Sequence, residues 1–91
     1  MIRFDPEKDK ANRAKHGFGL AQASRFELVA VFDDDRKDYG ERRRRAFGFI
    51  DGEPVVFVYT VREDHIRAIS LRRAHDKEFR RHGLPAPRRA H

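Results

Sequence analysis

Apolar residues gather in four short stretches in the middle of the chain, at residues 28–32, 42–50, 55–61 and 65–70, and these stretches predict β-strands. The pair Asp51-Gly52 favours a tight hairpin turn between the second and third stretch. The third stretch is apolar on both parities, as expected of a central strand covered on both faces, and Pro54 fits only at its first position. We therefore expect an antiparallel β-meander.

The clearest helix signal spans residues 5–17. Asp5 suits the N-cap, Pro6 suits the first helical position, and Gly17 can supply a left-handed C-cap. Residues 2–5 form a short strand-like stretch ahead of this helix. Because side chains at i, i+4 and i+8 share one helix face, three polar residues are expected to point the same way: Lys8, Asn12 and His16.

Two further helices are expected, at residues 20–26 and at about 72–82, where Gly83 ends the second. Residues 33–40 form a polar loop. The chain then divides into one domain, residues 1–82, and a basic proline-containing tail, residues 83–91. The fold class is α+β, with N-terminal helices packed on an antiparallel meander and a C-terminal helix.

Composition narrows the class of protein. The chain has 91 residues, of which 38% are hydrophobic and 40% charged, which suits one small domain. It has no cysteine, so disulfides and thiolate metal sites are excluded, and no apolar run approaches a membrane span. No association with a membrane is expected, and a reducing cytoplasm fits this composition.

The charge balance points to a partner. The chain has 21 Lys and Arg against 15 Asp and Glu, a net charge of +6 with a pI near 10.3. Such a balance favours a polyanion, nucleic acid before anionic lipid. The alternative is a soluble protein with an ordinary charged surface.

Arginines in and after the last predicted strand form one candidate site. Arg67 shares its parity with His65 and Ile69, while Ser70 takes the other parity. Arg72 and Arg73 follow at once, so that three guanidinium groups within seven residues can clamp a phosphate. A solvated strand face is the alternative.

Two other basic clusters are candidates. His16, next to Lys15 at the expected helix end, can exchange a proton near neutral pH; alternatively it caps the terminal carbonyls. Arg42–Arg45 is a run of four, of which at most two can reach one ligand from a strand. The alternative for this run is an outer face charged against edge pairing.

Metal sites are weakly indicated. The acidic residues at 33–35 and 38 lack the spacing and the glycine of a calcium loop, although they can be considered for Mg²⁺. The set His75, Glu78 and His82 lacks a convincing zinc spacing. We expect neither a metal nor another cofactor.

Several short motifs follow one another between residue 2 and about residue 82. The N-terminal motifs are Phe4-Asp5-Pro6-Glu7-Lys8, Asn12, Lys15-His16-Gly17 and Ala23. The middle motifs are Asp38-Tyr39-Gly40-Glu41-Arg42 and Gly48, and the C-terminal motifs are Val58-Tyr59-Thr60, Arg67 to Ala74 and Glu78. In this order and spacing they resemble the BrnT toxin family. One position departs from the family, whose last helix usually carries an aromatic residue where this chain has His82.

The resemblance implies a RelE-like fold and the toxin half of a type II toxin-antitoxin pair. Such a toxin is an endoribonuclease of the mRNA-interferase type that stops translation. Its partner would be a BrnA-like antitoxin with a ribbon-helix-helix part, and operator DNA would be bound only through the complex. The alternative function is a non-catalytic basic module that binds nucleic acid or a protein.

A metal-independent ribonuclease needs a base, an acid and cations for the phosphate. On the resemblance, the expected catalytic residues are Arg67 and Arg73 at the phosphate and His16 or Lys15 for proton transfer, with His65 in reserve. The expected substrate-binding residues, which would position the RNA, are Arg72, Ser70, Tyr59, Glu41 and Glu78.

Overall fold

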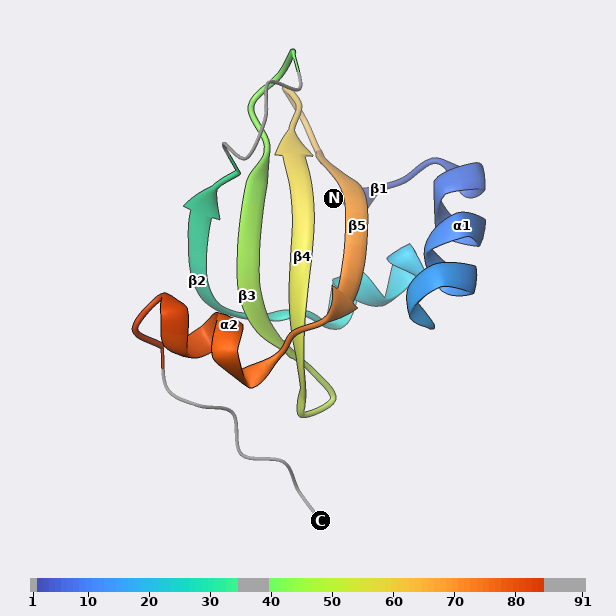
Figure 1. Ribbon diagram of the computed structural model, residues 1–91. Helices are drawn as coiled ribbons and strands as arrows, with labels where there is room; N and C mark the ends of the chain where they lie inside the picture. The colour runs from blue at the N-terminus through green and yellow to red at the C-terminus, as the bar shows by residue number, and fades with distance from the viewer. Residues whose placement is uncertain (1, 35–39, 85–91) are drawn as a thin grey trace.

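The computed structural model describes residues 2–34 and 40–84. In these residues five strands form one mixed sheet in the order β1-β5-β4-β3-β2 (Figure 1). The strands are β1 (Ile2–Arg3), β2 (Glu27–Asp33), β3 (Arg44–Ile50), β4 (Glu53–Val61) and β5 (Ile66–Arg73). The helices are α1 (Pro6–His16), the 3₁₀ helix η1 (Leu20–Arg25) and α2 (Asp76–Arg81). The α+β class is confirmed.

The predicted meander is confirmed for β2 to β5, whose neighbours all pair antiparallel. The expectation of a purely antiparallel sheet is wrong, because β1 lies parallel to β5. A parallel neighbour needs a long connection, and here α1, η1 and three strands lie between the paired segments. A two-residue strand carries too little pattern to reveal that pairing.

Local signals at the turns and caps are confirmed. Asp5 accepts a hydrogen bond from the backbone of Glu7, and Gly17 ends α1 in the left-handed conformation. Asp51 and Gly52 both have positive φ, 50° and 82°, as the tight β3–β4 turn requires. The prediction that Pro54 takes the first position of its strand is wrong, because β4 begins at Glu53 and Pro54 is its second residue.

The C-terminal helix begins later than the sequence predicts, at Asp76 and not near residue 72. Residues up to Arg73 continue β5, where Arg73 pairs with Val55, so α2 begins only at Asp76. Gly83 follows α2 with φ 70°, and the backbone N–H of Leu84 donates to the carbonyl of Phe79. Of the expected loop and tail, residues 35–39 and 85–91 lie outside the described residues.

The sheet separates two apolar clusters, which name its two faces. On the η1 face, Leu20 and Ala23 of η1 pack against the sheet, and the sheet's own buried residues there are Ala46, Ile50, Val55, Phe57, Ala68 and Leu71. On the α2 face, Phe79 of α2 and Ala74 pack against Phe47, Val56 and Val58. Figure 1 shows α2 lying across one end of the sheet, so the other end of the α2 face is left without a helix among the described residues.

Asn12 attaches α1 to the edge of β5. Its side-chain amide donates to the carbonyls of Phe18 and Leu71, both at 2.8 Å, and accepts from the Leu71 N–H at 3.1 Å. The residue is 6% exposed. Because β1 pairs with β5 only at residues 66 and 67, Asn12 meets a stretch of strand edge that has no neighbouring strand. The apolar contribution of α1 is small, so this polar clamp sets where its C-terminal turn lies.

β5 contains a bulge that changes which residues share a face. Val58 of β4 pairs with Ser70, but the next residue of β4 pairs with Ala68, so Ile69 is an extra residue. Ser70 lies opposite Val58 on the α2 face, whereas Leu71 belongs to the cluster on the η1 face. The expected alternation, which put Ser70 on the opposite face from Arg67, is therefore wrong.

Candidate functional site

A groove of about 250 Å³ runs between α1 and the bulged part of β5. The three residues expected to share one face of the first helix all line it, which confirms that prediction. The bulge supplies the opposite wall. The lining residues are Lys8, Ala11, Asn12, Lys15, His16, Ile69 and Ser70.

His16 is the titratable group of the groove with a shifted pKa. Burial lowers its pKa below the ordinary value of 6.5, and the positive charges of Lys15 and Arg72 lower it further. The imidazole is therefore neutral at physiological pH. A neutral imidazole can accept a proton, which is what a general base must do.

Arg72 borders this region and is held by α2. Its two terminal nitrogens donate to the two carboxylate oxygens of Glu78 at 2.8 and 2.7 Å. Glu78 also accepts from the backbone N–H of His75 at 3.0 Å. The hydrogen-bonded guanidinium of Arg72, with the His75 N–H, lowers the pKa of Glu78 from 4.5 to about 2. The pair fixes one cation at the edge of the α2 face.

Arg67 lies opposite Thr60 in the part of the α2 face that α2 leaves open. It is half-buried, and it has no ion pair or hydrogen bond to another described side chain. Because of the bulge, Arg72 and not Arg73 lies on the same face as Arg67. The expected phosphate clamp of Arg67 with Arg73 is therefore not formed.

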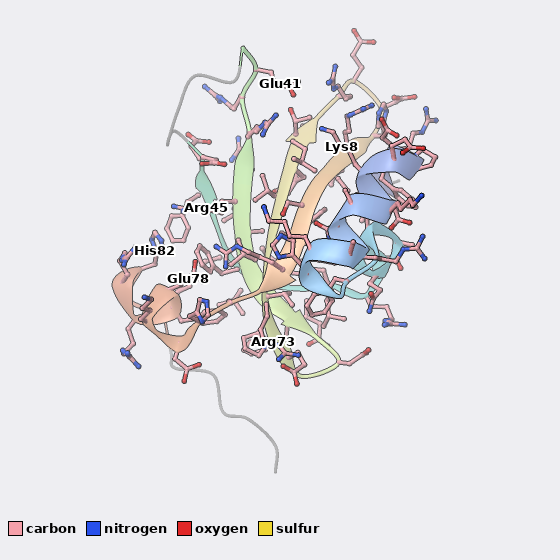
Figure 2. The ribbon with its side chains drawn as sticks, turned by 45° about the vertical axis from the view of Figure 1, so that its right-hand side comes forward. Lys8, Glu41, Arg45, Arg73, Glu78 and His82 are labelled. Atoms are coloured by element: carbon pink, nitrogen blue, oxygen red, sulfur yellow. The ribbon has the colours of Figure 1, made fainter. Side chains whose placement is uncertain are left out.

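Four expected site residues lie away from the groove. Arg73 contacts Glu53 at 3.4 Å on the η1 side, and Glu41 contacts Arg62 at 3.0 Å. Figure 2 shows Arg73 and Glu41 at opposite ends of the sheet. Tyr59 stacks on a phenylalanine and lines a separate apolar cavity of about 260 Å³ on the η1 face. His65 precedes β5 and contacts Asp64 at 2.7 Å.

Arg45 belongs to the candidate run Arg42–Arg45, but the sequence does not distinguish it from the other three arginines. It lies on β3 between Phe32 and Val58, on the α2 face, with its guanidinium 5.8 Å from the centre of the Phe47 ring. Its Nε is buried and has no hydrogen-bond partner among the described residues. The available signal was the run Arg42–Arg45, of which alternate members had to share a face.

His82, which replaces the aromatic residue usual in the family, keeps an aromatic packing role. Its ring stacks on Phe32 at 4.4 Å and lies 4.9 Å from the ring of Phe47. Both oxygens of Glu78 bind Arg72, so a zinc set with His75 and His82 is not assembled. Within residues 2–34 and 40–84, no group of three His, Asp or Glu side chains is placed to hold a metal ion. The same residues contain no helix long and apolar enough to cross a membrane.

The fold and the groove together define a small basic α+β domain with a neutral histidine and arginine side chains suited to a phosphodiester. Residues 4–78 match the family model described as the ribonuclease toxin, BrnT, of type II toxin-antitoxin system. The chain belongs to this family, which confirms the resemblance. Its substrate is therefore RNA and its partner an antitoxin. No individual curated protein matches the chain.

Proposed function

We propose that this protein is a metal-independent endoribonuclease of the mRNA-interferase type, which cleaves RNA in the groove between α1 and β5 and so inhibits translation. The observation that supports this most directly is His16, whose pKa is lowered on the wall of a groove beside Ser70 and near Arg72. A proton acceptor close to cations is the combination that phosphodiester transfer without a metal requires.

In the proposed reaction, His16 takes the proton of a ribose 2′-hydroxyl, and the 2′-oxygen forms a bond to phosphorus. The bond from phosphorus to the 5′-oxygen breaks, and Lys15 gives that oxygen its proton. The products are a 2′,3′-cyclic phosphate and a free 5′-hydroxyl. Arg67 stabilises the charge that develops on the phosphate, because a cation contributes most where negative charge appears in the transition state.

The remaining groups position the substrate. Arg72, fixed by Glu78, offers a second cation at the edge of the groove, and Ser70 a hydroxyl. His65 has no part in this proposal, because it contacts Asp64 away from the groove. Tyr59, Glu41 and Arg73 have no part in this proposal because their contacts lie elsewhere.

The proposed partner is a BrnA-like antitoxin with a ribbon-helix-helix part, which silences the toxin in the cytoplasm. Operator DNA is contacted only by the complex, through the antitoxin. The support for this is membership of a type II toxin-antitoxin family, together with the net charge of +6, which suits an acidic partner segment.

The test is to incubate the purified protein with a defined RNA in EDTA and to map the 3′ ends. Cleavage that leaves a 2′,3′-cyclic phosphate is expected. Intact RNA in this assay and again after ribosomes are added would overturn the proposal in favour of a non-catalytic binding module. Cleavage only with ribosomes would retain the enzyme and assign it a ribosome-bound substrate.

The matched variants are Arg67→Ala and Arg73→Ala, which remove the same charge from opposite faces of β5. Loss of a transition-state cation costs about 10²–10³ in rate, so Arg67→Ala should abolish most cleavage. Arg73→Ala should cleave normally. Equal rates for the two variants would remove Arg67 from the mechanism, provided that circular dichroism shows both to be folded.

A further inference from the structure

Arg45 carries a charge that the described part of the protein leaves unneutralised. The residue is half-buried, its guanidinium lies over the Phe47 ring, and it has no carboxylate partner there. Its buried Nε is an unmet donor, and an unmet buried donor is uncommon enough to need a reason. A cation held on an aromatic ring, with its terminal nitrogens uncommitted, is suited to an anion that comes from outside.

The preceding residue shows the contrast. Arg44 lies on the η1 side of the sheet, where it pairs with Tyr59 of β4. Its guanidinium is 3.9 Å from the carboxylate of Asp33. The two arginines are adjacent in sequence and share the same strand, so they differ mainly in the face that they occupy. Of these two arginines, only Arg45 lies on the α2 face, the face that also carries Arg67.

The register connects Arg45 to the groove. Arg45 of β3 pairs with Val58 of β4, and Val58 pairs with Ser70 of β5, which lines the groove. The three residues therefore form one row across the α2 face, about 10 Å from end to end by strand spacing. A polynucleotide that enters the groove at Ser70 and continues across β4 meets Arg45.

We infer that Arg45 binds a backbone phosphate of the RNA strand next to the one that is cleaved, so that the substrate crosses the α2 face from β5 to β3. This inference rests on the proposed function for the position of the cleaved bond. In Figure 2, Arg45 projects on the side of the sheet where Glu78 and His82 lie, away from the position of Arg73. Arg45 is a substrate-binding residue and takes no part in the proton transfers.

The test measures binding separately from cleavage. A short labelled 2′-O-methyl oligoribonucleotide, which lacks the attacking hydroxyl, is titrated against Arg45→Ala, Arg45→Lys and the matched control Arg44→Ala over a range of salt concentrations. Arg45→Ala should weaken binding about tenfold and flatten the slope of log affinity against log salt by about 0.7, the value for one contact to a single strand. Arg44→Ala should stay within about twofold of the unchanged protein.

Arg45→Lys should keep the salt slope, because it keeps the charge. It should bind RNA more weakly than the unchanged protein, because lysine lacks the forked geometry of the guanidinium. With cleavable RNA, Arg45→Ala should raise KM more than it lowers kcat. Equal effects of Arg45→Ala and Arg44→Ala on binding would overturn the inference, even if the protein cleaves RNA. If the protein does not cleave RNA but Arg45→Ala still binds more weakly than Arg44→Ala, the proposed reaction is overturned and Arg45 remains a binding residue.

Discussion

In β3 and again in β5, two adjacent arginines lie on opposite faces of the sheet. Arg44 and Arg73 lie on the η1 side, where each contacts an exposed carboxylate, at 3.9 and 3.4 Å. Arg45 and Arg72 lie on the α2 face, where one covers a phenylalanine ring and the other forms two hydrogen bonds to Glu78. Exposed pairs contribute about 0–1 kcal/mol, whereas a half-buried forked pair is stronger and fixes a direction. The net charge therefore predicts a polyanionic partner, and the strand register determines which arginines lie on the face where that partner can bind.

The largest effect is expected from detaching α1 from the edge of β5 at Asn12. Asn12→Ala removes three hydrogen bonds and leaves buried backbone groups of Leu71 without partners, which should lower the free energy of unfolding by about 2–4 kcal/mol. Urea unfolding measures this. Arg13→Ala on the exposed side of α1 is the control and should cost less than about 1 kcal/mol. A loss below 1 kcal/mol for Asn12→Ala would show that apolar contacts hold α1 in place.

A smaller effect on stability is expected from the carboxylate partners of Arg72 and Arg73 in β5. Glu78→Gln should lower the free energy of unfolding by about 1–3 kcal/mol, because Arg72 loses its charged partner. Glu53→Gln makes the same change at the partner of Arg73 and should cost at most about 0.5 kcal/mol, because both groups are exposed. Equal losses in urea unfolding would contradict the difference between the two faces.

The stability difference at Glu78 should depend on pH. Because the folded state lowers this pKa from 4.5 to about 2, the carboxylate stabilises the fold above pH 4.5. That contribution is lost as the pH falls from 4.5 towards 2. Unfolding curves of the unchanged protein and Glu78→Gln should therefore converge over this interval and stay apart, by a constant amount, at higher pH.

The smallest effect concerns the charge beside His16. Lys15→Ala removes a positive neighbour, so the protonated imidazole becomes less unfavourable and the pKa of His16 should rise. Burial is the larger cause and persists, so the value should stay below 6.5. An NMR titration of the His16 ring protons measures this, with Lys8→Ala as a control on the same groove. A fall in the pKa, or equal shifts in both variants, would contradict the assigned cause.

Signals within a few residues of each other predicted much of this fold. The Asp5 cap, the Gly17 end of α1 and the Asp51-Gly52 turn follow from backbone preferences that act locally. The pairing of β1 with β5 depends on the path of the whole chain, and two residues of strand carry no pattern of their own. The sequence could not reveal it for that reason.

The candidate site divides in the same way. Helical spacing alone predicted that Lys8, Asn12 and His16 share a face, and all three line the groove. Arg67 shares its face with Arg72 and not with Arg73 because β5 contains one extra residue. No residue type in that strand predicts a bulge. Arg45 could not be identified for a similar reason, because a run of four arginines does not indicate which two lie on the α2 face.

The clamp at Asn12 also bears on when the groove can form. Asn12 and Leu71 are 59 positions apart, and a ribosome releases the first long before the second. The hairpins of β2 to β5 join neighbouring segments and can form early, while closing the loop between α1 and β5 carries the larger entropic cost. A growing chain therefore carries its helix and most of its strands before it has a groove. The groove is completed only once Leu71 has been synthesised and released, because Asn12 has no partner in β5 before then.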